Sequence, residues 1–370
     1  MHGEYRSRYE RLQALMAVHG LSAIIVTSNP NYLYFTGHST WAWSQKSRPL
    51  VAIMHAEEEP MLVIPEMDIE NAKRQSWIRK RIVWKTLPFD SSIITRSMNV
   101  KRGAKIGLEY GAESRIGLTV ADLRKLERQL RTLGASLVDA SGLIWTLRSI
   151  KSRYEVDLIE KSAKIMSRAY RNFFEKLDRP FTARRMASIL GQEMLREGAD
   201  CVGFVIIGFL SGFLPDKQFE PGSLIRIDAG SIYNGYWSDF SRSAVIGIPK
   251  ANQEKNFRIA RGILHRCLER IREGSMISTL ATLAQAEMRR AGLPGNVTGR
   301  VGHGIGLDIT EPPSIAMWEK SSFRRNMTLA LEPVRFYRGN ELYHVEENLL
   351  VTGDGVRLLS EPDEILHSIR

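Results

Sequence analysis

The most informative segment of the chain covers residues 224–242 and reads LIRIDAGSIYNGYWSDFSR. Its Asn234-Gly235 pair lies between two runs rich in β-forming residues, which is the strongest local signal for a β-hairpin with a two-residue turn. That register makes Asp228 and Asp239 diagonal neighbours on one face of the hairpin, roughly 7–8 Å apart at the backbone. Two carboxylates at this separation can share a cation or a cation pair. The alternative is that both are exposed strand or turn acids, but Asp228 follows a largely buried run, where a carboxylate needs a partner or a metal ion.

Three further segments carry candidate metal ligands. His303 lies between glycines in residues 302–306, and imidazole is a common ligand of transition metals. Glu332 ends an apolar run, and Glu346 lies in another run of β-forming residues. Taken singly, each has an ordinary alternative, a loop histidine or a strand-end carboxylate. Together with the aspartate pair they supply four carboxylates and one imidazole, whose charge balances two divalent cations and suits manganese, iron or cobalt better than a structural zinc site.

Length and composition limit the class of protein. The chain has 370 residues, of which 43% are hydrophobic and 25% charged, so we expect two domains of an ordinary soluble protein. No apolar run reaches the length of a membrane-spanning helix, and the N-terminus lacks the apolar core of a signal peptide. Two cysteines are too few for a disulfide framework. These features predict a cytoplasmic protein without a membrane partner.

The net charge of +11 raises the question of nucleic-acid binding. The excess is +7 over residues 1–150 and +4 over residues 151–370, and it forms no long run of like charges. The short basic clusters resemble solvated helix faces or loops. We therefore expect no nucleic-acid partner.

Apolar periodicity divides the chain near residue 150. Residues 1–150 alternate helices with short apolar strands, which predicts a three-layer α/β domain. Ser152 and Glu155 form a capping box that opens a long amphipathic helix, and two strand-rich blocks follow it. The expected helices cover residues 8–19, 118–133, 181–198, 252–273 and 278–291; the expected strands cover 23–26, 50–54, 61–64 and 105–108, with strand-rich blocks at 203–247 and 327–359.

Nearly the whole chain resembles the superfamily of methionine aminopeptidase, prolidase and creatinase, which has the pita-bread fold. Residues 8–12, 21–26 and 31–37 resemble the N-terminal domain of creatinase or prolidase. The resemblance implies an α/β (α+β) protein with a creatinase-type N-terminal domain at 1–150 and a pita-bread catalytic domain at 151–370. The five metal ligands of the family map, in order, onto Asp228, Asp239, His303, Glu332 and Glu346. The segment at residues 351–355 also fits the family pattern, and its position identifies Glu346 rather than its neighbour Glu347 as the ligand.

Three departures from the family pattern affect the expected chemistry. Peptidases of the family carry a histidine ahead of the first aspartate, where we place Asp216 of the Leu214-Pro215-Asp216 segment. They carry a second histidine before the glutamate of a His-Glu-x-Pro motif, where this chain has Thr310. The arginine two residues before the last ligand is replaced by His344.

The resemblance implies two divalent ions (manganese, cobalt, iron or zinc) that supply an activated water molecule, with Glu332 acting also as general base. Thr310 can donate a hydrogen bond but carries no cationic charge, and losing one stabilising donor costs on the order of 10²–10³ in rate. Asp216 could act as an acid if buried; the alternative is a solvated aspartate. His344 shares a strand face with Glu346 and either approaches the metal or makes an outer hydrogen bond, which we favour.

A tryptophan-rich segment of the N-terminal domain is a candidate substrate contact. In dimeric relatives this region helps to form the partner subunit's active site, so the resemblance implies a homodimer. Trp41, Trp43 and Arg48 suit a small apolar or carboxylate-bearing ligand, because arginine binds carboxylates bidentately. Aromatic packing at a domain or dimer contact is the equally good alternative.

We expect a metal-dependent hydrolase of a C–N bond, with an Xaa-Pro dipeptide or a small-molecule amide as substrate. Because both histidines are missing, a lyase acting on a small metabolite with the same metals is an alternative. A catalytically weak binding or scaffold protein is a third, although a scaffold has no need for five metal ligands.

Overall fold

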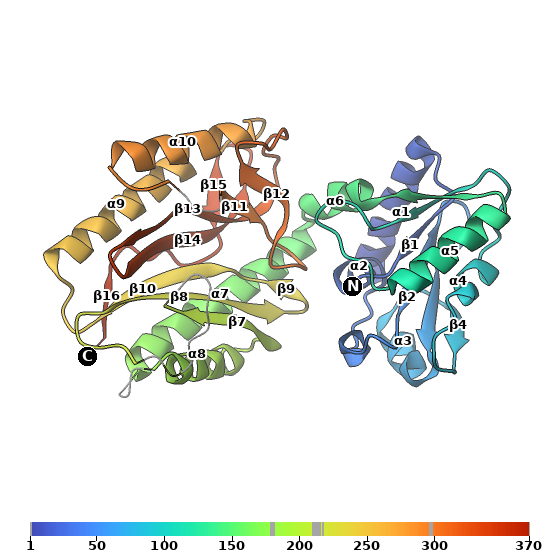
Figure 1. Ribbon diagram of the computed structural model, residues 1–370, viewed down its shortest axis with the longest axis horizontal. Helices are drawn as coiled ribbons and strands as arrows, with labels where there is room; N and C mark the ends of the chain where they lie inside the picture. The colour runs from blue at the N-terminus through green and yellow to red at the C-terminus, as the bar shows by residue number, and fades with distance from the viewer. Residues whose placement is uncertain (1, 178–181, 209–215, 217, 296–298, 370) are drawn as a thin grey trace. The chain divides into compact units, whose positions relative to one another are not determined.

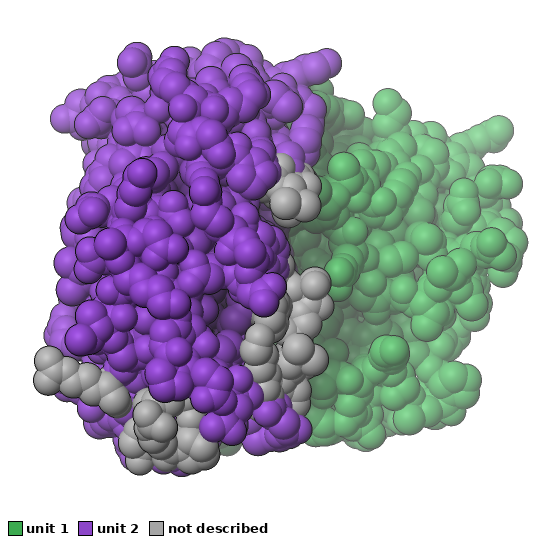
Figure 2. Space-filling view, turned by 60° about the vertical axis from the view of Figure 1, so that its left-hand side comes forward, with its two compact units in different colours: residues 1–148 green, residues 149–370 purple. Residues whose placement is uncertain are grey.

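The computed structural model describes residues 2–177, 182–208, 216, 218–295 and 299–369. The chain divides into two compact units, residues 1–148 and 149–370, which are coloured separately in Figure 2. Each unit has its own hydrophobic core. None of the helices in the described part of the chain is long and apolar enough to cross a membrane.

Unit 1 is built on a six-stranded mixed sheet with the strand order β4-β3-β2-β1-β5-β6. The strands β1, β2 and β3 pair antiparallel, whereas β4, β5 and β6 each join a parallel neighbour. The strands are β1 (Ala23–Val26), β2 (Val51–His55), β3 (Met61–Pro65), β4 (Lys80–Trp84), β5 (Lys105–Leu108) and β6 (Ser136–Asp139). The helices are α1 (His2–His19), α2 (Asn29–Thr36), α3 (Ile69–Gln75), α4 (Ser92–Arg96), α5 (Val120–Thr132) and α6 (Ser141–Ser149), with 3₁₀ turns η1 (Trp41–Ser44) and η2 (Glu66–Asp68).

The core of unit 1 follows from its apolar strands. Ile25 of β1 and Ile53 of β2 are fully buried against Leu126 and Leu130 of α5. These strands are apolar at consecutive positions because a central strand in an α/β domain is buried on both faces. The mixed α/β class predicted for this region is confirmed.

Unit 2 contains two five-stranded sheets. One has the order β16-β10-β8-β7 with β9 paired to β8, and the other has the order β12-β11-β13-β14-β15. The strands are β7 (Cys201–Ile207), β8 (Leu224–Tyr233), β9 (Tyr236–Trp237), β10 (Phe240–Ile246), β11 (Arg300–Gly304), β12 (Glu311–Ala316), β13 (Thr328–Arg338), β14 (Glu341–Val351), β15 (Val356–Leu358) and β16 (His367–Ile369). The helices are α7 (Arg153–Lys176), α8 (Ala183–Arg196), α9 (Ala251–Leu268) and α10 (Ile277–Arg290).

The helices of unit 2 lie outside the two sheets. Figure 1 shows α7 and α8 along the sheet that contains β7, β8 and β10, and α9 and α10 along the sheet that contains β13 and β14. The strands β10 and β14 lie against each other where the two sheets meet. Side chains of β8, β10, β13 and β14 can therefore converge between the sheets.

The hairpin predicted from Asn234-Gly235 is confirmed. Both turn residues have positive φ angles, 49° and 81°, as a two-residue hairpin turn requires. Tyr233 pairs with Tyr236, and the same register continues into the pairing of β8 with β10. The capping box of Ser152 and Glu155 at the start of α7 is also confirmed.

Several short strands differ from the sequence expectation. A glycine-flanked loop was the alternative considered for His303, but this residue lies on β11, an inner strand of the second sheet. The strands β4, β6, β11, β12 and β16 were not predicted, because charged, polar, glycine or proline residues interrupt their apolar pattern, whereas the predicted strands of similar length are mostly apolar. The start of the expected helix at 181 lies outside the described residues.

Candidate metal centre

The hairpin supplies two of the buried carboxylates. Asp228 lies on β8, and Asp239 lies between β9 and β10. The backbone of Asp239 is held by Asn348, whose side-chain oxygen accepts a hydrogen bond from the Asp239 N–H at 2.9 Å and whose amide donates to the Asp239 carbonyl oxygen at 2.5 Å. These two hydrogen bonds connect the backbone of Asp239 to β14 of the second sheet.

The second sheet supplies the other three candidate ligands. His303 lies on β11, opposite Ala330 of β13. Glu332 occupies an irregularity in the pairing of β13 with β14, and Glu346 lies on β14. All five candidate ligands are buried, each with no more than 6% of its surface exposed.

The candidate ligand atoms form two triads. In the first, Asp239, His303 and Glu346 each offer an atom within 4.8 Å of the others, and in the second Asp228, His344 and Glu346 do the same. Glu346 belongs to both triads. The triads contain four of the five ligands selected from the sequence, together with His344, which was also a candidate. The fifth, Glu332, lies beside them, with its Oε2 3.1 Å from His344 Nε2.

The tautomer of His303 makes the first triad suitable for a cation. Its Nδ1 lies 3.0 Å from the carbonyl oxygen of Gly304, which can only accept, so Nδ1 carries the proton. Burial lowers the pKa of His303, so the ring is neutral and its Nε2 presents a lone pair. This Nε2 faces Asp239 Oδ2 at 3.5 Å. Two acceptors that face each other in a buried site need a proton or a cation between them.

The carboxylates of the first triad show the same deficit of positive charge. Burial raises the pKa of Asp239, and the nearby Glu332 adds to the effect. Burial also raises the pKa of Glu346, and Asp239 adds to it. Glu346 Oε2 and Asp228 Oδ1 have no hydrogen-bond partner among the described residues. The residues present therefore fit a divalent ion. A bound cation would interact with the unpartnered lone pairs and would also reduce the repulsion between the carboxylates.

Two arginines that the sequence analysis did not select reach the same cluster. Arg226, only 2% exposed, donates from Nη2 to Asp228 Oδ2 and from Nε to His344 Nδ1 at 3.0 Å. Arg335 donates from Nη2 to Glu332 Oε2. Arg226 precedes Asp228 by two residues on β8 and so shares its face of the strand, which is the signal that could have identified it.

His344 links these arginines to the ligands. Because the Nε of Arg226 can only donate, His344 Nδ1 accepts, and the proton of the neutral ring is on Nε2. That Nε2 lies 3.1 Å from Glu332 Oε2, to which it donates. Burial lowers the pKa of His344 to about 3. For Glu332, burial raises the pKa, but the hydrogen bond from His344 and the charge of Arg335 outweigh it and lower the pKa to about 2.

The residues at the two replaced histidine positions are placed differently. Thr310 is half-buried and directly precedes β12. The next residue, Glu311, forms an ion pair with Lys151 at 3.1 Å in which both side chains are 1% exposed. Asp216 is 81% exposed and pairs with Arg184 at 3.1 Å; Leu214 and Pro215 lie outside the described residues.

The tryptophan-rich segment lies in unit 1. Trp41 is 61% exposed at the start of η1. Trp43 packs edge-on against Tyr32, with the ring centroids 5.1 Å apart, and its Nε1 has no hydrogen-bond partner among the described residues. Arg48 lies within 3.0 Å of the sulfur atom of Met67.

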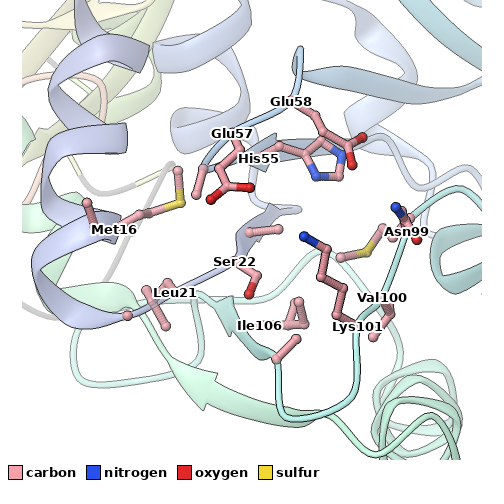
Figure 3. Close-up of a pocket in the computed structure, with 16 residues that line it drawn as sticks. Met16, Leu21, Ser22, His55, Glu57, Glu58, Asn99, Val100, Lys101 and Ile106 are labelled. Carbon is pink, nitrogen blue, oxygen red and sulfur yellow. The ribbon is translucent and has the colours of Figure 1, made fainter.

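Unit 1 also encloses a cavity of about 440 Å³ (Figure 3). Its walls come from α1, β1, β2 and the segment before β5, and none of the residues selected from the sequence lines it. Figure 3 shows Glu57 and Lys101 on different sides of the cavity, with Met16 and Leu21 forming part of its apolar wall. The Nε2 of His55, also in the wall, has no partner among the described residues.

Comparison with known families agrees with this geometry. Residues 157–353 match the model of metallopeptidase family M24. The chain belongs to this family. Residues 8–150 match the N-terminal domain of creatinase and prolidase. The predicted family and the pita-bread fold are thereby confirmed.

The similarity to individual M24 proteins is distant but extends over both chains. The Xaa-Pro dipeptidases of Pyrococcus horikoshii and Pyrococcus furiosus are 24% and 25% identical, and the alignments cover 97% and 98% of this chain and 98% and 99% of theirs. The solved prolidase of Thermococcus sibiricus superimposes with a TM-score of 0.88 at 22% identity, over 98% of this chain and 99% of the other. At that identity the structural likeness shows the fold alone.

Proposed function

We propose that this M24 protein is a divalent-metal-dependent hydrolase of a C–N bond, and that Xaa-Pro dipeptides are the first substrates to test. The observation that carries the proposal is the triad of Asp239, His303 and Glu346, whose buried acceptor atoms lie within 4.8 Å of one another and need a proton or a cation between them. The dipeptidases named above support the choice of substrate. The mostly oxygen-bearing ligand set favours manganese, iron or cobalt.

The ligands and Glu332 have separate tasks in the proposed reaction. Asp239, His303 and Glu346 would hold a divalent ion, which would supply polarisation of a substrate carbonyl and a lowered pKa of a water molecule. Glu332 is held ionised by His344 and Arg335, so it is ready to accept a proton as general base. Releasing its contacts with these two residues would raise its affinity for that proton.

Three groups are candidates to replace the missing histidines as hydrogen-bond donors. Thr310 stands at one of the two replaced positions. Arg226 Nη1 and Arg335 Nε have no partner among the described residues, and both arginines contact the ligand cluster. A buried donor without a partner gains most by binding a substrate oxygen. Asp216 is exposed and paired with Arg184, so burial does not support the acid role considered for it.

A second candidate function follows from the same arginines. A site that presents guanidinium groups in place of imidazoles suits a small substrate with its own carboxylate, because arginine binds carboxylates strongly. We therefore keep hydrolysis of a small amide, or a lyase reaction on a small metabolite, as the alternative. A catalytically weak binding protein is the remaining possibility.

The test combines metal content with substrate turnover. The purified protein is assayed with manganese, cobalt, iron and zinc against a panel of Xaa-Pro dipeptides, with product mass spectrometry. We expect metal-dependent turnover. Metal binding without dipeptide turnover would favour the small-amide or lyase reaction, and absence of metal would exclude all three metal-dependent reactions.

The substitution Thr310→His tests the departure from the family pattern directly. Restoring the imidazole should raise dipeptide turnover, by up to about 10²–10³-fold if Thr310 stands where the substrate oxygen binds. Thr310→Val is the matched control, because it removes the hydroxyl group and keeps the shape. An unchanged rate in Thr310→His would show that residue 310 is not at the catalytic position.

The homodimer and the roles of Trp41, Trp43 and Arg48 are further parts of the proposal. We expect the protein to be a dimer in solution, which light scattering after gel filtration measures. If the three residues contact substrate, Trp41→Ala and Arg48→Ala should raise KM more than they lower kcat. If they only pack at an interface, the same substitutions should change the oligomeric state instead.

A further inference from the structure

We propose that the ligand cluster binds one divalent ion, at Asp239, His303 and Glu346, and that the guanidinium group of Arg226 takes the place of a second ion beside Asp228. The inference rests on the proposed metal-dependent function and specifies the number of ions. It departs from the two ions that the family resemblance implies.

Charge balance is the first argument. The carboxylates of Asp228, Asp239, Glu332 and Glu346 carry four formal negative charges, and Arg226 and Arg335 are in contact with two of them. The two arginines leave a net charge of two negatives, which one divalent ion neutralises. A second ion would give a buried site an excess of two positive charges, which is costly in a medium of low dielectric constant.

The position of Arg226 is the second argument. Arg226 is buried, and its Nη2 contacts Asp228 Oδ2, so one oxygen of this carboxylate already faces a cation. Its side chain extends from the same face of β8 as Asp228, two residues away, so the strand itself keeps the guanidinium beside the carboxylate. The positive charge beside Asp228 is thus supplied by a side chain of the protein itself.

The hydrogen bonding of His344 is the third argument. Of the two triads, the one with Asp228 and Glu346 needs a lone pair from His344. Its Nδ1 lone pair already accepts from Arg226 Nε, and its Nε2 carries the proton that Glu332 accepts. A neutral imidazole has only these two ring nitrogens, so His344 has no lone pair left for a metal.

The first triad differs in its hydrogen bonding. His303 uses Nδ1 to donate to Gly304 and keeps its Nε2 lone pair for the cluster. Glu346 Oε2 has no hydrogen-bond partner among the described residues, and the Asp239 carboxylate faces the unprotonated Nε2 of His303 at 3.5 Å. The two halves of the cluster therefore differ. In the Asp228 half Arg226 contacts one carboxylate oxygen, Oδ2, and Oδ1 alone is left without a hydrogen-bond partner among the described residues, whereas the Asp239 half keeps the Nε2 lone pair of His303 and Glu346 Oε2 for an ion.

Metal stoichiometry of the native protein is the primary test. The full chain is stripped of metal, titrated with Mn²⁺ by calorimetry, and its bound metal is measured by mass spectrometry after dialysis. We expect one Mn²⁺ per chain and the electron paramagnetic resonance spectrum of an isolated ion. Two ions per chain with an exchange-coupled spectrum would overturn the inference and leave the proposed hydrolase intact. No bound ion, together with no metal-dependent turnover, would overturn both.

Three variants locate the ion. His303→Ala should reduce the stoichiometry from one to none, whereas Asp228→Asn should leave it at one. Arg226→Met keeps the length of the side chain but removes its charge and frees His344 Nδ1, so it should raise the stoichiometry to two. The control Arg171→Met removes an exposed arginine that pairs with Glu361 and should leave it at one.

The variant results can contradict the inference independently of the native measurement. Folding is checked by circular dichroism in the presence of Mn²⁺. Loss of the bound ion in Asp228→Asn would place it beside Asp228 and overturn the assignment. A stoichiometry that stays at one in folded Arg226→Met would show that Arg226 does not occupy an ion's position.

Discussion

Strand β14 presents two neighbouring glutamates to opposite faces, and their surroundings differ completely. Glu347 accepts hydrogen bonds from Arg242 Nη2 at 3.1 Å, Arg261 Nη1 at 2.8 Å and Ser360 Oγ at 2.6 Å. Glu346 faces Asp239 and His303, and its Oε2 has no hydrogen-bond partner among the described residues. Both side chains are buried, with at most 2% exposed.

The comparison separates a structural carboxylate from one suited to a ligand. Burial penalises an ionised carboxylate unless hydrogen bonds and opposite charge compensate it. For Glu347 the chain provides that compensation. Its hydrogen bonds with Arg242 and Arg261 connect β14 to β10 and to helix α9. For Glu346 the compensation is incomplete, which leaves the residue dependent on a cation from solution.

The largest expected effect is on metal binding in Glu346→Gln. An amide is a poor substitute for an ionised ligand shared by the triad, so affinity for Mn²⁺ should fall by more than the roughly 100-fold typical of losing an outer-shell partner. Calorimetric titration measures the affinity. The metal-free variant should unfold at the same or a higher urea concentration than the native chain, because a repulsive buried charge is removed. Tight Mn²⁺ binding by the variant would show that Glu346 is not a ligand.

Glu347→Gln should show the reverse pattern. Breaking a buried ion pair by removing one partner typically costs about 3–5 kcal/mol, and here Arg242 and Arg261 both lose their counter-charge. Urea unfolding of the metal-free protein measures the loss. In the fraction that is folded, the number of bound Mn²⁺ ions should be unchanged; a lower number would mean that the two faces of β14 are not independent.

Unit 1 offers a second fully satisfied carboxylate. Glu109 is buried, and it accepts from the backbone N–H groups of Thr27 and Ser28 and from the Asn31 amide. Glu109→Ala leaves these donors without an acceptor, at about 1–3 kcal/mol for each that water does not reach. Urea unfolding should show the loss, while Glu70→Ala, at an exposed ion pair, should leave the stability nearly unchanged. Equal effects of the two substitutions would contradict the assigned role.

The smallest expected effect concerns His55, the buried group in unit 1 with a free Nε2. Burial lowers its pKa below the ordinary 6.5, so the unfolded chain takes up this proton first as the pH falls. The free energy of unfolding should therefore decrease below about pH 6.5, by at most about 1.4 kcal/mol per pH unit from this residue. His55→Gln should remove that share of the acid sensitivity.

Much of this arrangement could be predicted from local sequence. Asn234-Gly235 determines the hairpin register because few other dipeptides accept two positive φ angles. The register in turn places Asp228 and Asp239 on one face. The capping box of Ser152 could be predicted equally well, because its hydrogen bonds join residues only three positions apart.

The missing parts depend on contacts between distant segments. The choice between Glu346 and Glu347 needed a family resemblance, because both stand in the same apolar run. Arg226 was overlooked because its neighbours along the chain are apolar, and its role depends on His344, which lies 118 positions later. The tautomer of His344 likewise follows only from which atoms surround it in the folded chain.

The buried ion pair of Lys151 with Glu311 has a practical consequence for dissecting the protein. Lys151 is the third residue of unit 2, and its backbone N–H also donates to the carbonyl oxygen of Asn326 at 2.9 Å. A C-terminal fragment that begins after Lys151 would remove the lysine that pairs with the buried Glu311 carboxylate, directly beside Thr310. Fragments intended to carry the ligand cluster alone should therefore begin before Lys151, although α7 itself starts only at Arg153.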